Sequence, residues 1–331
     1  MAPYRILTLD GGGIRGLLTA IILARLEAAV PGWLSKVDLF AGTSTGGILA
    51  LGLANGRSPT EARFLYENQG SEVFADSALD NLLNLGNAIG AQYGNKALKR
   101  VLEEQFGDKT LADLPHKVLI SSFDLDNGED KPAPLRTWKP KFFHNFPGAD
   151  SDGAERIVDV ALRTSAAPSY FPVYQGYVDG GLVAGNPSMA ALAQALEPTT
   201  GKQSLDNISL LSIGTGRGAQ FLTTQNADWG WLQWAPKIID IILDGSSGVA
   251  DYECRQLLGD RYHRLDPLLP ESIGLDSIEK IPRLIEIANR VMIETTVDWL
   301  KPAPDPAAGP RTFRGWFEPA ARPTNGPRAP R

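Results

Sequence analysis

The sequence predicts an α/β fold in which helices flank a mostly parallel central sheet. Two observations near the N-terminus support this prediction. Residues 4–9 (YRILTL) form a short apolar run of strand-forming residues, and a glycine loop and a helical apolar pattern over 17–30 follow it. Residues 39–41 repeat the arrangement, because a tight turn and a second apolar run, 48–53, come after them. Strands that alternate with helices in this way are typical of parallel sheets, which need long crossover connections.

The composition places the chain among ordinary globular proteins. It has 331 residues, of which 43% are hydrophobic and 21% charged, and its net charge of −6 gives no basic field that would attract nucleic acid. Cys254 is the only cysteine, which excludes an intramolecular disulfide and suits a reducing compartment. The sequence shows no secretory signal pattern and no apolar run of transmembrane length, so we expect a cytoplasmic protein with at most peripheral membrane contact.

Residues 42–46 (GTSTG) match the pattern G-x-S-x-G between a strand and a helix, which is the pattern of a nucleophile elbow. In such an elbow the turn holds the serine at strained backbone angles and lifts its hydroxyl clear of the sheet. Gly42 and Gly46 would leave room for the backbone to bend, and the helix would direct its N-terminal amides to the same place. The pattern also occurs in ordinary glycine-rich loops. Ser44 is therefore a candidate nucleophile.

The glycine loop, residues 11–16 (GGGIRG), connects the first strand to the first helix. Three consecutive glycines would let backbone N–H groups converge on one spot, as the stabilisation of an oxyanion in acyl transfer requires. Arg15 could brace this loop or lie in solvent. A nucleotide-binding module is an alternative, because the loop also matches G-x-G-x-x-G. That fingerprint expects an acidic residue at the end of the second strand, where this chain has the turn that contains Ser44.

Asp179 is a candidate partner of the serine. It follows a strand-like segment and precedes Gly180 and Gly181, so that its carboxylate can be presented at the end of a strand. Asp-Gly is also an everyday turn signal, and the residue by itself does not establish a site.

A histidine is the other candidate activator, because serine is a poor nucleophile until a base accepts its proton. The chain has only three, His116, His144 and His263. The order Ser44, Asp179, His263 matches that of the triad in α/β-hydrolases. Against a triad, the elbow comes unusually early in the chain, and His263 lies in a strand-like segment.

Further elements are predicted along the chain. We expect a helix that begins at the capping box 58–61, helices over 95–106, 157–162, 188–196, 228–243 and 277–299, and strands over 117–123, 135–138 and 208–213. Residues 228–243 carry three tryptophans and an isoleucine-rich run, for which core packing is the default interpretation and contact with a lipid interface the alternative.

Three motifs in order, DGGGIRG at 10–16, GTSTG at 42–46 and DGG at 179–181, resemble the patatin family of lipid acyl hydrolases. Shorter matches support the resemblance, which spans about residues 4–300: TSAAPSYFP at 164–172, NP at 186–187, LSIGTG at 211–216 and DGSS at 244–247. The resemblance implies a three-layer patatin-like fold over residues 1–301. Residues 302–331, rich in Pro, Ala and Arg, lie outside it and are expected to form a C-terminal tail.

The resemblance also implies a Ser–Asp dyad that uses no histidine, metal or cofactor. Ser44 would be the nucleophile, Asp179 would be the general base for both the serine and the hydrolytic water, and Gly42, Gly46, Gly180 and Gly181 would shape their turns. The oxyanion hole would come from the amides of Gly11, Gly12, Gly13, Ile14 and Arg15. The implied substrates are phospholipids, galactolipids or glycerides. A storage protein or a ligand-gated signalling effector with secondary hydrolase activity remains an alternative.

Overall fold

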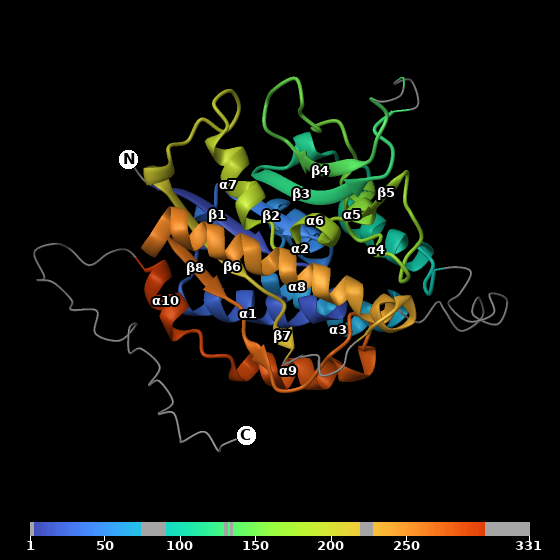
Figure 1. The fold of residues 1–331 in the computed structure, drawn as a ribbon. Coiled ribbons are helices and arrows are strands. Elements are labelled where there is room, and N and C mark those ends of the chain that lie inside the picture. Colours follow the sequence, from blue (N-terminus) through green and yellow to red (C-terminus); the bar gives the residue numbers. More distant parts are fainter. Residues whose placement is uncertain (1–2, 74–90, 129–131, 133–134, 219–227, 302–331) are drawn as a thin grey trace, which may run out of the picture. The chain divides into compact units, whose positions relative to one another are not determined.

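A seven-stranded sheet runs through the described part of the chain, in the order β4-β3-β2-β1-β6-β8 with β5 also paired to β3 (Figure 1). Its strands are β1 (Tyr4–Leu9), β2 (Leu39–Thr43), β3 (Lys117–Asp124), β4 (Lys139–His144), β5 (Tyr177–Asp179), β6 (Ile208–Ile213) and β8 (Tyr262–Leu265). The pairs β1–β2, β2–β3, β1–β6 and β6–β8 are parallel, whereas β4 and β5 run antiparallel to β3. The predicted mostly parallel sheet is confirmed.

This computed structural model describes residues 3–73, 91–128, 132, 135–218 and 228–301. The described residues up to Leu300 form one compact unit. The predicted tail over 302–331 lies outside the described residues. No helix of the described part is long and apolar enough to cross a bilayer.

Helices cover both faces of the sheet (Figure 1). The main ones are α1 (Gly16–Ala29), α2 (Thr45–Ala54), α3 (Pro59–Val73), α4 (Lys96–Phe106), α5 (Ile157–Thr164), α6 (Gly181–Ala184), α7 (Ser188–Leu196), α8 (Trp231–Leu258), α9 (Ile281–Arg290) and α10 (Glu294–Leu300). The predicted capping box at the start of α3 is present, because Ser58 Oγ accepts the Glu61 N–H at 3.2 Å and Glu61 Oε2 accepts the Ser58 N–H at 2.8 Å.

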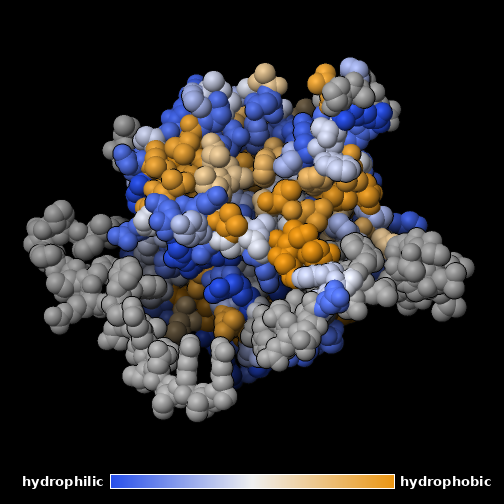
Figure 2. Space-filling model, viewed as in Figure 1, coloured by the Kyte–Doolittle hydropathy of each residue, from blue (hydrophilic) through white to orange (hydrophobic). Residues whose placement is uncertain are grey.

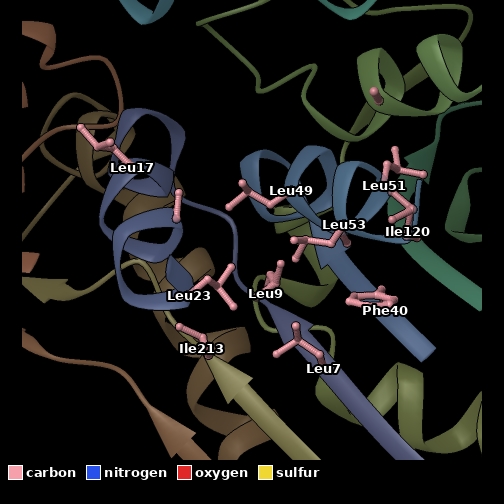
Figure 3. Close-up of a cluster of buried hydrophobic side chains, with 14 of the residues drawn as sticks. Leu7, Leu9, Leu17, Leu23, Phe40, Leu49, Leu51, Leu53, Ile120 and Ile213 are labelled. Atoms are coloured by element: carbon pink, nitrogen blue, oxygen red, sulfur yellow. The ribbon is translucent and has the colours of Figure 1, made fainter. Parts of the chain in front are cut away.

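Two hydrophobic cores form because alternate residues of a strand point to opposite faces. Leu7 and Phe40 belong to the core under α1, α2, α5 and α9, part of which Figure 3 shows. Their strand neighbours Ile6 and Leu39 belong to the core under α7 and α8. The sheet is therefore buried on both faces, and the three layers agree with the expected architecture.

The strand register brings the glycine loop, the elbow and Asp179 to the same edge of the sheet. Leu9 pairs with Gly42, so the glycine loop and the elbow leave neighbouring strands at the same edge. Thr43 pairs with Ser121, and the next residue of β3, Ser122, pairs with Asp179. Because β4 occupies the other edge of β3, β5 continues along β3 directly beyond the end of β2, and Asp179 lies next to the elbow.

Two predicted elements are wrong in detail. The return strand after β3 is β4 and not residues 135–138. The backbone of residues 135–138 bonds instead to the side chain of Asn127. Asn127 Nδ2 donates to Leu135 O at 3.0 Å, and Asn127 Oδ1 accepts the Thr137 N–H at 3.0 Å. Residues 277–299 form two helices and not one. The break after α9 is stabilised by Arg25, whose Nη1 donates to the carbonyls of Ala288 and Val291 at 2.6 and 2.8 Å.

Of the predicted helix over 228–243, residues 231–243 belong to α8, and core packing does not account for all of its apolar side chains. Trp234, Ile241 and Ile242 are exposed, as are Val249 and Tyr252 further along. Figure 2 shows apolar side chains gathered over this helix. The alternative of a lipid interface remains a prediction.

Candidate active site

Ser44 occupies a strained turn between β2 and α2. Its backbone has φ 54° and ψ −125°, a combination that costs a non-glycine residue energy and is concentrated at functional sites. The two motif glycines make the turn possible. A Cβ at Gly42 would lie 2.1 Å from the carbonyl oxygen of Gly46, and one at Gly46 would lie 2.2 Å from that of Leu9. The elbow geometry predicted from G-x-S-x-G is confirmed.

A threonine holds this turn in place. Thr164 Oγ1 accepts a hydrogen bond from the Ser44 N–H at 2.8 Å and donates one to the carbonyl of Ser121 at 2.6 Å. The elbow is thereby tied to both α5 and β3. Sequence reasoning quoted Thr164 only as part of a longer matching stretch and assigned it no role.

Asp179 ends β5 and is buried beside the serine. Its Oδ1 accepts the Gly181 N–H at 2.7 Å, and the Ser44 hydroxyl lies near enough to the carboxylate to lower its pKa. Burial is the larger effect and raises the pKa of Asp179 to about 6, whereas the Ser44 hydroxyl and the Gly181 N–H lower it. Gly180 is required for close packing, because a Cβ there would lie 2.3 Å from the Ser121 carbonyl oxygen. Above pH 6 the side chain is therefore a carboxylate in contact with the serine hydroxyl.

The glycine loop borders the serine, because a Cβ at Gly11 would lie 3.4 Å from Ser44 Cβ. Three of its five predicted donors already have acceptors: Gly11 N–H to Gly185 O (3.0 Å), Ile14 N–H to Leu275 O (2.7 Å) and Arg15 N–H to Gly12 O (3.1 Å). The N–H groups of Gly12 and Gly13 have no acceptor among the described residues. Of the five amides predicted to form an oxyanion hole, those of Gly12 and Gly13 therefore remain as candidates.

Arg264 is a residue near the site that sequence reasoning missed. Its side chain is 6% exposed and bonds to Asp10, the residue before the glycine loop, and to Asp266 at 2.9 Å. The sequence carried a signal for this pair, because a charged residue in a strand-like segment needs a partner of opposite charge if its side chain is buried. The sequence analysis considered this segment only because it contains His263.

The alternative triad of Ser44, Asp179 and His263 does not assemble. His263 lies on β8, three strands from β2 in the sheet order, which corresponds to about 14 Å across the sheet. Its Nε2 is 2.9 Å from Thr296 Oγ1, and its ring stacks on Trp299. Burial lowers the pKa of His263 to about 4. None of the three histidines is among the described residues that line the cavity at Ser44.

That cavity has a volume of about 170 Å³ and is lined mainly by apolar residues of α2, α3 and α4. Ser44, Asp179 and the glycine loop lie together at its wall. A serine in a strained turn, a buried carboxylate and two amides without an acceptor among the described residues thus meet where an apolar ligand could enter, which is an arrangement suited to acyl transfer.

Comparison with known proteins agrees with this geometry. The family model of patatin-like phospholipases matches residues 7–192. CotR of Bacillus subtilis is 35% identical over 323 residues, covering 89% of this chain and 96% of the relative. A cGAMP-activated phospholipase of Pseudomonas aeruginosa is 35% identical over 271 residues, covering 80% and 78%. Patatin-2-Kuras 4 of Solanum tuberosum is 31% identical over 293 residues, covering 75% and 72%.

Proposed function

The chain belongs to the patatin-like phospholipase family, and from this premise we propose that it hydrolyses fatty-acyl esters of lipids with Ser44 as nucleophile and Asp179 as general base. The observation that carries the proposal is that the strained Ser44 and the buried Asp179 carboxylate lie together at the wall of an apolar cavity. The family supports lipid hydrolysis in general. The roles of the individual residues are our proposal.

In the first half of the reaction, the Asp179 carboxylate accepts the hydroxyl proton while Ser44 Oγ attacks the ester carbonyl. The oxygen that gains negative charge is held by the N–H groups of Gly12 and Gly13, and each such donor contributes about 3 kcal/mol to transition-state stabilisation. The intermediate then expels the alcohol part of the lipid, which takes the proton from Asp179. An acyl-enzyme ester on Ser44 remains.

In the second half, Asp179 accepts a proton from water, and the resulting hydroxide oxygen attacks the acyl-enzyme carbonyl. The same two amides hold the charge, and the proton returns to Ser44 Oγ as the fatty acid leaves. Every proton moves between the chain, water and the lipid, so that the scheme requires no metal or cofactor. We expect phospholipids, galactolipids or glycerides as substrates, presented from a lipid surface that the protein contacts peripherally.

A ligand-gated effector is the second candidate, and one observation favours it. A relative that is 35% identical carries the name cGAMP-activated phospholipase. In this case basal hydrolysis would be low and would rise when a cyclic dinucleotide is added. A storage role predicts low hydrolysis that no nucleotide raises.

Fatty-acid release from mixed phospholipid and galactolipid micelles, in the presence of chelator, tests the proposal. The wild type and Ser44→Ala are compared with and without cGAMP, and Ser35→Ala, an exposed serine of another segment, is the matched control. Release by the wild type and by Ser35→Ala, but not by Ser44→Ala, supports the proposal. Equal release by all three would show that Ser44 is not the nucleophile, and release only with cGAMP would establish the gated form.

A further inference from the structure

The cavity beside Ser44 continues along α2 as an apolar channel. Thr45, Ile48, Leu49, Gly52 and Leu53 line it. Their spacing of three to four residues places them on one face of the helix, from its first turn to its last. At a rise of 1.5 Å per residue, the eight residues from Ser44 to Gly52 span about 12 Å.

The opposite walls come from one face each of α3 and α4. The α3 helix returns alongside α2, because the Tyr66 hydroxyl bonds to Thr45 near the nucleophile while Arg57 lines the cavity near the other end of α2. The C-terminus of α4 is tied to that same end, where the Lys109 side chain, just beyond the helix, donates to Asn55 Oδ1 at 2.8 Å. The channel therefore runs from the nucleophile toward the turn between α2 and α3.

Gly52 has no packing reason to be glycine. A Cβ at this position would meet no atom of the described residues within 4 Å. The other two glycines of α2 differ, because a Cβ at Gly46 would lie 2.2 Å from backbone and one at Gly47 would lie 3.0 Å from Thr164. Glycine inside a helix is less favourable than alanine. An open position on the channel wall is the feature that explains its presence.

The apolar lining ends at polar groups. Arg57 and Glu61 both line the cavity and form an ion pair at 3.1 Å, with about half of the Glu61 side chain exposed (52%). Gln105 of α4 lies on the same cavity wall. The end of an alkyl chain that reached these groups would lose its apolar surroundings and would displace their hydration.

We propose that this channel is the subsite for the fatty-acyl chain, that it selects chains of medium length, and that Gly52 keeps its distal half open. The proposal rests on the hydrolase function proposed above. With C–C bonds of about 1.5 Å at tetrahedral angles, an extended chain advances about 1.25 Å per carbon, so that the 12 Å span holds about ten carbons. Acyl groups near this length would fill the apolar part, and longer ones would meet the polar end.

The test is the chain-length profile of p-nitrophenyl ester hydrolysis, measured as the ratio of kcat/KM for the decanoate to that for the butyrate. The variant Gly52→Leu places a side chain in the channel, and we expect this ratio to fall at least tenfold. Gly52→Ala favours the helix but blocks part of the apolar subsite. We therefore expect it to lower the decanoate-to-butyrate ratio about threefold. Gly248→Leu is the matched control, because Gly248 is a helical glycine with equally open surroundings on α8, away from the cavity. An equal loss for both esters, or no loss for either, would overturn the proposal.

A binding measurement separates this proposal from the hydrolase function. Decanoate is titrated calorimetrically into Ser44→Ala and into Ser44→Ala/Gly52→Leu. Binding by the first protein, weakened at least tenfold in the second, supports the channel even if no ester is hydrolysed. Equal binding by both proteins, or by neither, contradicts it whatever the activity of the wild type.

Discussion

The guanidinium group of Arg264 donates hydrogen bonds to both carboxylate oxygens of Asp10, at 3.1 and 2.6 Å. Both side chains are buried, and Asp10 directly precedes Gly11, the first residue of the glycine loop. Burial raises the pKa of Asp10 to about 6, while Arg264 acts in the opposite direction and favours the charged form. The pair therefore anchors the loop to β8, which lies three strands from the elbow strand β2 in the sheet order.

Removing the arginine is expected to destabilise the protein. Arg264→Met keeps much of the volume but leaves the Asp10 carboxylate buried and unpaired, which typically costs about 3–5 kcal/mol. Urea unfolding at pH 7 measures this loss. The double variant Asp10→Asn/Arg264→Met should recover part of the loss, because no buried charge remains in that pair. An unfolding free energy for Arg264→Met equal to that of the wild type would show that the pair does not anchor the loop.

Hydrolysis should depend on the ionisation of Asp179. The raised pKa of about 6 means that its base form is lost as the pH falls below 6. We expect kcat/KM to be level above pH 7 and to fall about tenfold per pH unit below 6. A neutral glyceride substrate avoids titration of the head group. A profile that stays flat down to pH 4.5 would be inconsistent with Asp179 as the base.

The raised pKa of Asp179 also predicts that stability, unlike activity, falls as the pH rises. Asp179 titrates near pH 4 when unfolded and near 6 when folded, so that between these values the folded state binds more protons. Its contribution to stability is present below pH 4 and is lost as the pH rises through 6, amounting to at most about 3 kcal/mol. Asp179→Asn should therefore be inactive yet more stable than the wild type at pH 7, with little difference at pH 4. Denaturant unfolding at both pH values measures this, and lower stability of the variant at pH 7 would refute the prediction.

The threonine behind the elbow should matter for activity. Thr164→Val keeps the shape but removes the oxygen that accepts the Ser44 N–H. An unsatisfied buried N–H costs about 1–3 kcal/mol, and a displaced nucleophile loses on the order of 100-fold in rate. We expect kcat to fall by 10- to 100-fold. The matched control is Thr60→Val, on the exposed side of α3. Equal kcat for the two variants would remove Thr164 from the positioning of Ser44.

The variant His263→Ala distinguishes a Ser44–Asp179 dyad from a triad that includes His263. Because the ring lies on β8 and contacts Thr296 and Trp299, we expect His263→Ala to hydrolyse esters within about twofold of the wild type while losing about 1 kcal/mol of stability. Michaelis–Menten kinetics together with a melting curve measure both quantities. Loss of turnover with an unchanged melting temperature would favour the triad instead.

The sequence by itself determined the local geometry of the site. A glycine on each side of Ser44, between an apolar strand and an apolar helix, is sufficient to predict the strained turn, because steric limits on the backbone act between near neighbours. The capping box at Ser58 and Glu61 was predictable for the same reason. Short apolar runs of strand-forming residues predicted the strands, and the order of the three glycine-containing motifs indicated the family.

Only the tertiary structure decided which distant groups meet. The pairing of Ser122 with Asp179 sets that carboxylate beside Ser44, and a buried ion pair joins residues that are 254 positions apart. The helix break after α9 depends on Arg25, and the choice of Gly12 and Gly13 as free donors depends on acceptors elsewhere in the fold. The physical reason is that a buried hydrogen-bonding group must find a partner, and strand order, which no local pattern encodes, determines which partners are within reach.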